Sequence, residues 1–452
     1  MLKTSKYNFI WPVEGSDKAV IFNSFTTATM EINKHQLSFL ENDKNIELDH
    51  LDEKEKETVS NLLKGGFLIE DFVDELSILK VRNGNGRFKK DTLSLTIIPT
   101  FNCNLKCFYC YQDRNIVSEM SLETQEALIQ YISQSAKEVK KISVIWYGGE
   151  PLLAWDTICS LSQKIIKIAD ENNCKYATGI VTNGYLFDED KILKLKELKI
   201  KTVQITLDGP PKVHSRRKGL PGEPEADFEK MLSTIEKLIE NKLNVSIRIN
   251  IDKTNMNSID ELLDILVKRN IKEAAIYPGQ VTADTKACSN IDEVCLHTKE
   301  FSDLEINFYK LLVEKGLKTD FSYSYPNIKT NFCGADQANS FIISPEGYVY
   351  KCWSEINGKS DMVFDILKRD QNTEDIKRMR MKNISWKCWD PFEFEKCVSC
   401  KLLPICMGGC PHSYKIKNTG EPVCMTLKEN LEQIIMNHYY CTKVRKLFDE
   451  TR

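Results

Sequence analysis

The sequence has no long apolar run, no marked excess of either charge and no polybasic stretch. No segment approaches the ~18 consecutive apolar residues that span a bilayer, so we expect no membrane-spanning helix. The first residues, MLKTSKYNFIWPVEG, contain no uninterrupted apolar stretch before a small-residue cleavage site, so we expect no signal peptide and a cytoplasmic location. A formal net charge of −3 with few Lys- or Arg-rich runs argues against a nucleic-acid partner.

Cysteine, by contrast, is abundant. The chain holds 16 cysteines among 452 residues, of which 42% are hydrophobic and 28% charged. This composition is too apolar for a disordered chain, and the length suggests two to four domains at ~100–200 residues per domain. Without an export signal, disulfides are not expected, and clustered cysteines indicate metal binding or catalysis.

The cysteines form two groups. Three stand at positions 103, 107 and 110, eight lie between residues 333 and 424, and five are scattered. Because over two hundred residues separate the two groups, we expect two metal-bearing regions.

The middle of the chain alternates short apolar segments with amphipathic ones. We expect buried strands at 93–100, 142–149, 176–184, 203–209, 245–251 and 274–280. Helical periodicity lies between them, as in 121–139 and 188–199. This alternation predicts an α/β fold, in which six parallel strands joined by right-handed crossovers form an open or partial (β/α)6 barrel. The chemistry of such a barrel lies at the carboxyl ends of its strands.

Cys103, Cys107 and Cys110 come directly after the first of these strands. Three thiolates at this spacing can converge on one metal centre from a single loop. A structural zinc site is normally closed by four ligands, usually as two separated pairs. A 4Fe–4S cluster held by three cysteines keeps one iron open. The residues alone therefore favour an iron–sulfur cluster, with zinc or three unrelated cysteines as the alternatives.

The spacing CxxxCxxC, with Tyr109 before the last cysteine, resembles the signature of the radical S-adenosylmethionine (SAM) superfamily. The resemblance implies that these three cysteines hold a 4Fe–4S cluster whose open iron binds the amino and carboxylate groups of SAM. An electron from the cluster would cleave SAM, and the resulting 5′-deoxyadenosyl radical would abstract a hydrogen atom from the substrate.

Further motifs of that superfamily follow in order. Gly148-Gly149-Glu150-Pro151 comes after the second strand, like the GGEP loop of the superfamily. Glycines let the backbone approach a ligand closely, and a carboxylate can receive the SAM ammonium group. A Thr-Asn-Gly turn containing Asn183 follows the third strand, and an Asp-Gly-Pro turn follows the fourth at 208–210.

Related enzymes carry an arginine soon after the Asp-Gly-Pro turn that pairs with the SAM carboxylate. Here Arg217 is favoured, Arg216 is the alternative, and Arg248 on the fifth strand is a further candidate. The SAM-binding residues that the resemblance implies are Tyr109, Gly148, Gly149, Glu150, Asn183, Arg217 and Arg248.

The second cysteine group resembles the seven-cysteine pattern of the SPASM domain, an extension that carries two auxiliary 4Fe–4S clusters. The resemblance implies an outer cluster on Cys397, Cys400, Cys406 and Cys424, and an inner cluster on Cys333, Cys352 and Cys410. Zinc on the CxxC pair is the alternative, but it does not explain seven ordered cysteines beside a radical SAM core.

The fourth position of the inner cluster has no assigned ligand. Some related sequences place a cysteine six residues after the first, where this chain has Asn339. Either an iron is open there, able to bind a substrate thiolate, or a residue such as Cys388 fills the position. Cys388 as an ordinary core cysteine is an equal alternative.

Residues 1–80 differ in character from the rest. Short strands with a turn at 14–17 precede a helix at 53–66 that the glycines at 65 and 66 end, after which the chain extends again. This order resembles a winged-helix-like peptide-recognition element, which captures the leader of a ribosomally made precursor as an added strand. A structural cap over the barrel is the alternative.

These features predict five regions. They are a peptide-recognition domain at 1–80, a Gly- and Asn-rich linker at 81–91, a radical SAM core at 92–320, a SPASM domain at 321–425 and a C-terminal helix at 426–452.

The resemblance implies a radical SAM maturase that forms a thioether between a Cys sulfur and a carbon of a precursor peptide, as in sactipeptide and ranthipeptide biosynthesis. Its cofactors would be three 4Fe–4S clusters, about twelve irons per chain, and SAM. Its partners would be the precursor peptide and a reductant such as flavodoxin or ferredoxin. No residue is assigned as a catalytic acid or base.

Other functions remain open. Anaerobic sulfatase maturases carry a catalytic Asp directly after the cysteine that corresponds to Cys352, where this chain has Trp353, so that function takes second place. Carbon–carbon crosslinking and epimerisation are alternatives within the same class. An iron–sulfur electron-transfer or sensor protein is the non-enzymatic alternative, but it leaves the GGEP loop and the two later turns unexplained.

Overall fold

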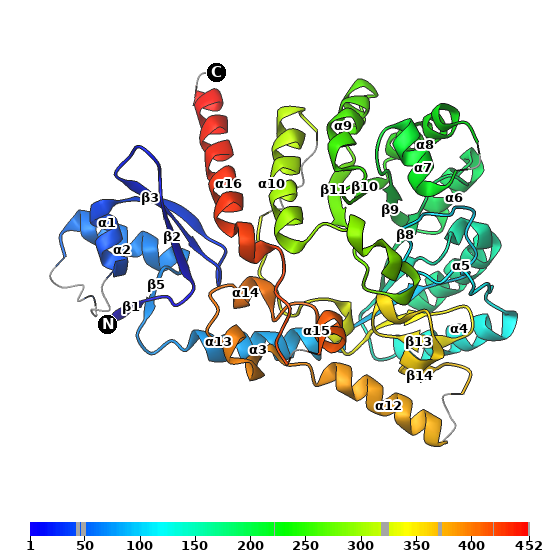
Figure 1. Cartoon of the computed structure of the whole chain (residues 1–452). Helices are drawn as coiled ribbons and strands as arrows, with labels where there is room; N and C mark the ends of the chain where they lie inside the picture. The colour runs from blue at the N-terminus through cyan, green and yellow to red at the C-terminus, as the bar shows by residue number, and fades with distance from the viewer. Residues whose placement is uncertain are drawn as a thin grey trace. The chain divides into compact units, whose positions relative to one another are not determined.

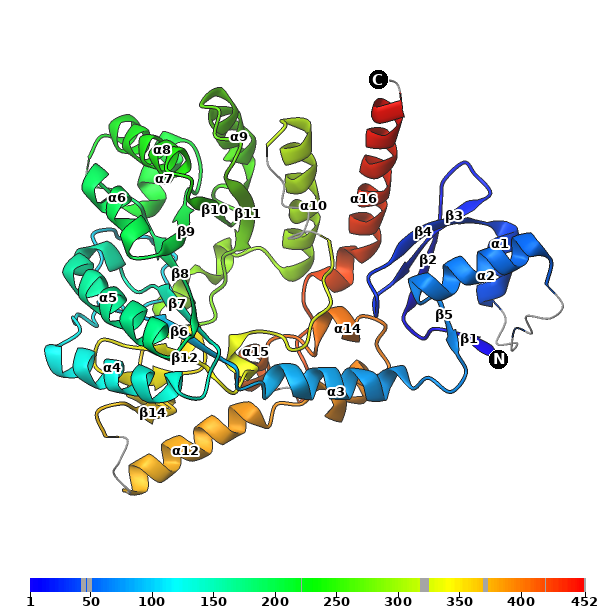
Figure 2. The ribbon, with the colours of Figure 1, turned by 180° about the vertical axis from the view of Figure 1, so that it is seen from behind.

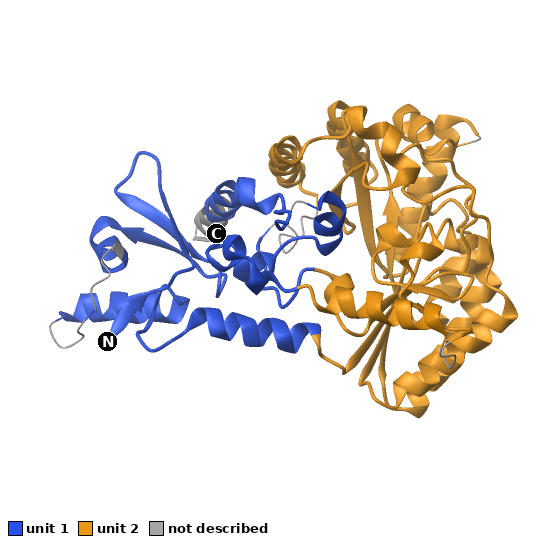
Figure 3. Cartoon of the chain, turned by 60° about the horizontal axis from the view of Figure 1, so that its bottom comes forward, with its two compact units in different colours: residues 1–87, 321–332, 390–452 blue, residues 88–320, 333–389 orange. Residues whose placement is uncertain are grey.

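The computed structural model describes residues 1–41, 46, 51–220, 222–317, 325–368, 373–418 and 420–450. The chain divides into two compact units (Figure 3). The first comprises residues 1–87, 321–332 and 390–452, and the second 88–320 and 333–389. No helix of the described residues is both long and apolar enough to cross a membrane.

The second unit is built on a nine-stranded sheet with the order β11-β10-β9-β8-β7-β6-β12-β13-β14. Its first six strands run parallel in chain order. They are β6 (Thr92–Ile97), β7 (Lys141–Trp146), β8 (Lys175–Thr182), β9 (Ile200–Thr206), β10 (Asn244–Ile251) and β11 (Ala275–Gln280). Each coincides with a predicted strand, so the predicted α/β core of six parallel strands is confirmed.

Helices cover the outer face of this sheet (Figures 1 and 2). They are α4 (Leu122–Ala136), α5 (Trp155–Glu171), α6 (Glu189–Glu197), α7 (Pro211–Lys218), α8 (Pro224–Glu240), α9 (Ile259–Lys268) and α10 (Thr298–Glu314). The apolar faces of the helices pack on alternate strand residues such as Ile142, Val144 and Trp146, which are fully buried. This burial drives the formation of the core.

A smaller part of the second unit extends the sheet beyond β6. It contains β12 (Ser340–Ile343), β13 (Tyr348–Tyr350), β14 (Phe364–Asp365), α12 (Glu374–Lys387) and the short 3-10 helices η5 (Gly334–Asp336), η6 (Trp353–Glu355) and η7 (Lys359–Asp361). Strand β12 pairs in parallel with β6, and β13 and β14 add antiparallel strands. Residues 333–389 of the predicted SPASM domain therefore share one sheet with the barrel.

The N-terminal part of the first unit combines short strands and helices in the predicted order. It contains β1 (Leu2–Thr4), β2 (Asn8–Pro12), β3 (Lys18–Asn23), β4 (Thr29–Asn33), α1 (Lys34–Glu41), α2 (Glu53–Gly65), β5 (Leu68–Glu70) and α3 (Glu75–Arg87). Strands β2, β3 and β4 form an antiparallel sheet. Helix α2 ends where predicted, because Gly66 adopts a left-handed conformation with φ of 73°.

The predicted linker at 81–91 is wrong for residues 81–87, which continue helix α3. Leu79, Asn83 and Arg87 recur every four residues and are buried along one face of that helix. The Asn83 side chain donates a 2.8 Å hydrogen bond to the carbonyl of Thr330. Burial of this face outweighs the low helix propensity of Gly84 and Gly86.

The C-terminal part of the first unit contains η8 (Pro391–Glu393), α13 (Glu395–Val398), α14 (Leu403–Cys406), α15 (Pro411–Lys417) and α16 (Leu427–Glu450). Helix α16 matches the predicted C-terminal helix over its described length. Val20 and Phe22 of β3 share a hydrophobic core with Ile405 and Ile435. The cysteine-rich segment after residue 390 therefore folds with the N-terminal domain, a pairing that the predicted boundaries do not contain.

The predicted boundary at 320/321 lies outside the described residues. The functional identity of the five predicted regions stays a prediction.

Candidate functional site

The three cysteines of the first motif line a cavity of about 680 Å³ in the second unit. Cys103, Cys107 and Cys110 lie on the loop after β6, and all three are free thiols. Residues that follow the other parallel strands, or lie near their carboxyl ends, complete the wall: Gly148, Gly149, Thr182, Asn183, Thr206, Arg248, Asn250 and Gln280. The cavity therefore opens at the edge of the sheet where the fold predicts chemistry.

Burial raises the pKa of Cys103 to about 12 and also raises the pKa of Cys110. Among the described residues, no three His, Cys, Asp or Glu side chains are grouped as ligands of a single metal ion. A thiolate set of this kind is stable when a bound metal group supplies positive charge, so the cysteines fit a cationic cluster.

Two glycines hold the cysteine loop in place. The N–H of Gly149 donates to the carbonyl of Thr100 at 3.1 Å, and the N–H of Glu150 donates to Asn102 at 2.8 Å. A Cβ on Gly149 would meet the Asn102 carbonyl oxygen at 2.2 Å. Gly148 has φ of 139°, and a Cβ there would meet the Thr100 oxygen at 2.5 Å. Only glycine allows this approach.

Glu150 lies behind this turn and is fully buried. Its carboxylate accepts hydrogen bonds from the Thr182 hydroxyl at 2.6 Å, the Asn183 N–H at 2.8 Å and the Leu152 N–H at 2.9 Å. Burial raises the pKa of Glu150 to about 7, against the effect of these hydrogen bonds. Glu150 is not among the residues that line the cavity, so in this structure it joins β7 to β8.

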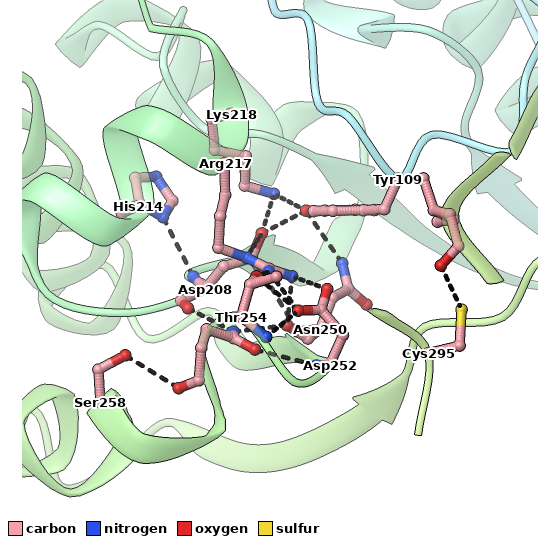
Figure 4. A network of polar contacts seen from close by, with 12 residues as sticks. Tyr109, Asp208, His214, Arg217, Lys218, Asn250, Asp252, Thr254, Ser258 and Cys295 are labelled. Carbon is pink, nitrogen blue, oxygen red and sulfur yellow. Dashed lines mark hydrogen bonds and ion pairs between the residues drawn. The ribbon is translucent and has the colours of Figure 1, made fainter. Parts of the chain in front are cut away.

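Tyr109 lines the cavity and belongs to a buried polar network (Figure 4). Its hydroxyl donates to the Asp208 carboxylate and accepts from Lys218 Nζ at 2.7 Å. Asn250 also donates to this hydroxyl, at 3.3 Å. The cations Lys218 and Arg217 offset the burial of Asp208 and hold the pKa of its carboxyl below the usual range. Asp208 thereby fixes the ring of Tyr109 beside the cysteines.

Arg217, the favoured SAM-binding arginine, does not line the cavity. It is 1% exposed, and its guanidinium forms 2.8 Å contacts with both oxygens of Asp252. It also donates to the Asn250 carbonyl at 3.1 Å. Arg217 therefore ties α7 to the end of β10, and Arg216 on the same helix is exposed.

Among the described residues, the cations that line the cavity are Lys218, Arg248 and Arg114. Arg248 donates from Nε to Asn250 Oδ1 at 2.8 Å and packs over Gly279, where a Cβ would meet its guanidinium at 2.6 Å. Sequence reasoning selected Arg248 but missed Lys218. The available signal was that Lys218 directly follows Arg217. Adjacency in the sequence does not indicate which of the two side chains faces the cavity.

An aromatic group lines another side of the cavity. The hydroxyls of Tyr111 and Tyr147 share a 2.6 Å hydrogen bond. Trp353 packs edge-on against Tyr147, with ring centroids 4.3 Å apart. Trp353 is the residue that stands where sulfatase maturases carry Asp, so an aromatic ring takes that place here. Tyr111 and Tyr147 carried no sequence signal.

The other three cysteines of the predicted outer cluster, Cys400, Cys406 and Cys424, lie within electrostatic range of Cys397 in the first unit. Burial raises the pKa of Cys397 to about 12, and Cys406, Cys400 and Cys424 add to the rise. The N–H of Leu402 donates to Cys400 Sγ at 3.4 Å. Four neighbouring sulfurs with a backbone donor fit a cluster that would lower their pKa values.

The predicted inner ligands are divided between the units. Cys333 and Cys352 belong to the second unit, and Cys410 belongs to the first, where its sulfur accepts from the Ser413 N–H at 3.4 Å. Cys388 belongs to the second unit and is exposed at the end of α12. The assignment of these residues to an inner cluster stays a prediction.

Residues 97–266 match the family model of the Radical SAM superfamily. The chain contains a radical SAM domain. This match runs from the last residue of β6 into α9 and includes the three cysteines and both glycines of the cavity. The expectations of an α/β radical SAM core and of an enzyme are confirmed, and the domain implies a 4Fe–4S cluster and SAM as cofactors.

Curated relatives extend this similarity. The chain is 24% identical over 385 residues to a cysteine-type anaerobic sulfatase-maturating enzyme of Clostridium perfringens, covering 79% of this chain and 95% of the relative. It is 26% identical to the Fe-coproporphyrin III synthase of Methanosarcina barkeri, covering 52% of this chain and 56% of that enzyme.

Two solved structures share the fold. The structure of anSMEcpe with bound AdoMet has a TM-score of 0.57 and 19% identity, and the match covers 80% of this chain and all of that one. Streptococcus suis SuiB bound to its precursor peptide SuiA has a TM-score of 0.54 and 16% identity over 94% of this chain and 99% of that one. Both structures are under 25% identical to this chain, so these matches show a shared fold.

The glycine turn generates a direct prediction. Gly149→Ala should displace the cysteine loop, because its methyl group has no room against two backbone carbonyls. We expect reconstituted protein to lose most of the iron of the SAM cluster, measured as iron per chain and by EPR. Gly84→Ala is the control, because a Cβ there meets no atom within 4 Å. Unchanged iron content in Gly149→Ala would contradict the packing.

Substitution of Arg217 should mainly lower stability, whereas substitution of Arg248 should mainly weaken SAM binding. Arg217→Met leaves the buried Asp252 without its cation, which should cost about 3–5 kcal/mol of unfolding free energy. Arg248→Met should change stability by about 1 kcal/mol or less but weaken SAM binding roughly tenfold or more. Chemical denaturation measures the stability of each variant, and SAM titration measures its affinity for SAM. If both variants stayed stable and lost the same amount of SAM affinity, the two roles would be wrong.

His214 should make stability depend on pH. Burial lowers its pKa from 6.5 to about 3, and its Nδ1 accepts from the Asp208 N–H at 3.1 Å. Because the folded state binds this proton less tightly, stability is retained above pH 6.5 and falls by about 1.4 kcal/mol per pH unit below it. His214→Gln should reduce this slope between pH 6 and pH 4. An identical slope in both proteins, measured by urea unfolding, would show that another group is responsible.

Proposed function

We propose that this radical SAM enzyme modifies a ribosomally made precursor peptide by joining a Cys sulfur to a carbon of another residue. The observation that carries the proposal is the cavity, where three cysteines lie beside Tyr109, Lys218 and Arg248. When bound there, the cluster and SAM supply a 5′-deoxyadenosyl radical that removes a hydrogen atom from a substrate carbon.

Different residues of the chain would bind the cluster and SAM. Cys103, Cys107 and Cys110 would hold the cluster, and the backbone of Gly148 and Gly149 would approach SAM. Tyr109 and Asn183 lie on the same wall and would orient its adenosyl part. Arg248 would pair with the SAM carboxylate, since Arg217 is already bound to Asp252 and Lys218 to Asp208.

The aromatic side of the cavity would exclude water from the reacting carbon. Tyr111, Tyr147 and Trp353 form this wall. Formation of the C–S bond removes two hydrogens from the peptide, one as a hydrogen atom from carbon and one from the thiol as a proton and an electron. An auxiliary cluster would accept that electron, and a flavodoxin- or ferredoxin-type protein would exchange electrons with the enzyme.

A peptide substrate is supported by the N-terminal domain. Among the described strands, β4 pairs only with β3, so its other edge is available for an added strand. The similarity to SuiB, which was solved with its precursor peptide, spans 94% of this chain and so includes that domain. We propose that the leader of the precursor binds there, and that the chain carries three 4Fe–4S clusters.

Sulfatase maturation is the second candidate, because a sulfatase-maturating enzyme is similar over 95% of its length. Trp353 in place of the catalytic Asp disfavours it. Asp113 and Asp284 also line the cavity, so a base from another position would be required.

Peptide mass and thiol counting distinguish these functions. The reduced enzyme is incubated with SAM and a Cys-containing precursor, and then the product is alkylated with iodoacetamide. We expect a loss of two hydrogens and of one alkylatable thiol per crosslink, with the sulfur retained. A Cys→Ser precursor is the control and should stay unmodified.

Other outcomes identify the alternatives. Loss of sulfur from the peptide would indicate sulfatase-type maturation. Loss of two hydrogens with every thiol still alkylatable would indicate a carbon–carbon crosslink, and an unchanged mass with a D-residue would indicate epimerisation. Any of these three results would overturn thioether formation.

A further inference from the structure

Tyr7 lies between β1 and β2 in the first unit and is fully buried. Its ring stacks on Phe25 with centroids 5.8 Å apart and packs among Leu79, Leu403 and Met407. Two of these neighbours, Leu403 and Met407, come from the cysteine-rich segment after residue 390. The N-terminal domain thus places a tyrosine inside the core that supports the outer cysteines.

The hydroxyl of Tyr7 has no hydrogen-bond partner among the described residues. A buried hydroxyl without a partner is costly, and a bound group at the site is one way in which native proteins satisfy such a hydroxyl. Cys397 is one of the partly buried members of the hydrophobic cluster around Tyr7.

Cys400 lies within electrostatic range of this hydroxyl, as do the carboxylates of Glu75 and Asp74. A tyrosine hydroxyl is protonated at neutral pH, so Tyr7 offers an O–H donor. Negatively charged sulfur is the acceptor that Cys397 and Cys400 would offer once they hold a cluster.

Tight packing fixes the position of this donor. The Ser24 hydroxyl donates to the carbonyl of Lys401, and Lys401 Nζ donates to the carbonyl of Asn8 at 2.9 Å. Lys6 Nζ donates to the carbonyl of Val398 at 2.7 Å. Residues on both sides of Tyr7 are thereby tied to the segment that carries Cys397 and Cys400.

We propose that Tyr7 donates a hydrogen bond to a sulfur of the outer auxiliary cluster, at the Cys397 and Cys400 side. The N-terminal domain would then help to set the reduction potential of that cluster. A hydrogen bond to sulfur stabilises the more negative, reduced state and so raises the potential. Tyr7 is a positioning and tuning residue here, and the inference rests on the cluster content proposed above.

The test compares full-length, reconstituted Tyr7→Phe with the unchanged protein. Redox titration followed by EPR should show the outer cluster at a more negative midpoint potential in Tyr7→Phe, with the other clusters unchanged. Tyr325→Phe is the matched control, because its hydroxyl already donates to the Thr27 carbonyl at 2.8 Å. An unchanged potential in Tyr7→Phe with an intact outer cluster would overturn the inference.

A second variant tests the donor directly. Fluorotyrosine at position 7 keeps the ring and makes the hydroxyl a stronger donor, so it should shift the potential in the opposite direction to Tyr7→Phe. Shifts of the same sign in both variants would indicate disturbed packing and would overturn the hydrogen bond. Iron analysis of the unchanged protein separates failure of the Tyr7 hydrogen bond from failure of the proposed cluster content. About four irons per chain would refute the proposed auxiliary clusters.

Discussion

The contact between two backbone segments at the carboxyl edge of the sheet supports the rest of the site. The residues at 100–102 and 148–150 lie so close that neither Gly148 nor Gly149 has room for a Cβ. Their hydrogen bonds fasten the cysteine loop after β6 to the turn after β7. The contacts with the turn after β7 therefore set the position of the cysteine loop. A cluster bound by only three thiolates needs such preorganisation, because its fourth iron must stay accessible.

A second constraint joins distant parts of the chain. The cysteine-rich segment after residue 390 shares its core with β3 of the N-terminal domain, through Val20, Phe22, Ile405 and Ile435. Residues 333–389 instead continue the sheet of the radical SAM core through β12. The region that sequence resemblance treats as one auxiliary domain is thus built into both units. The strand edge proposed to bind the leader and the cysteines proposed to hold the outer cluster therefore both belong to the first unit.

Sequence patterns predicted those features that depend on local periodicity or spacing. The six parallel strands, the end of α2 at Gly66 and the cysteine loop belong to this group. The choice among neighbouring cations could not be predicted, because each residue along α7 turns the side chain by about 100°. Arg217 therefore meets buried Asp252 whereas Lys218 reaches the cavity. The linker prediction failed at residues 81–87, because composition does not reveal the buried helix face that Asn83 shares with Arg87.

EPR of the reduced, reconstituted enzyme with and without SAM tests this arrangement most directly. A three-thiolate cluster at the cavity has an open iron that SAM can bind, whereas an auxiliary cluster outside the cavity does not meet SAM. We predict that SAM shifts the signal of one cluster and leaves the remaining signal unchanged, and that 5′-deoxyadenosine then accumulates. A spectrum that does not respond to SAM, in protein with full iron content, would contradict the assignment of Cys103, Cys107 and Cys110 as ligands of an open cluster.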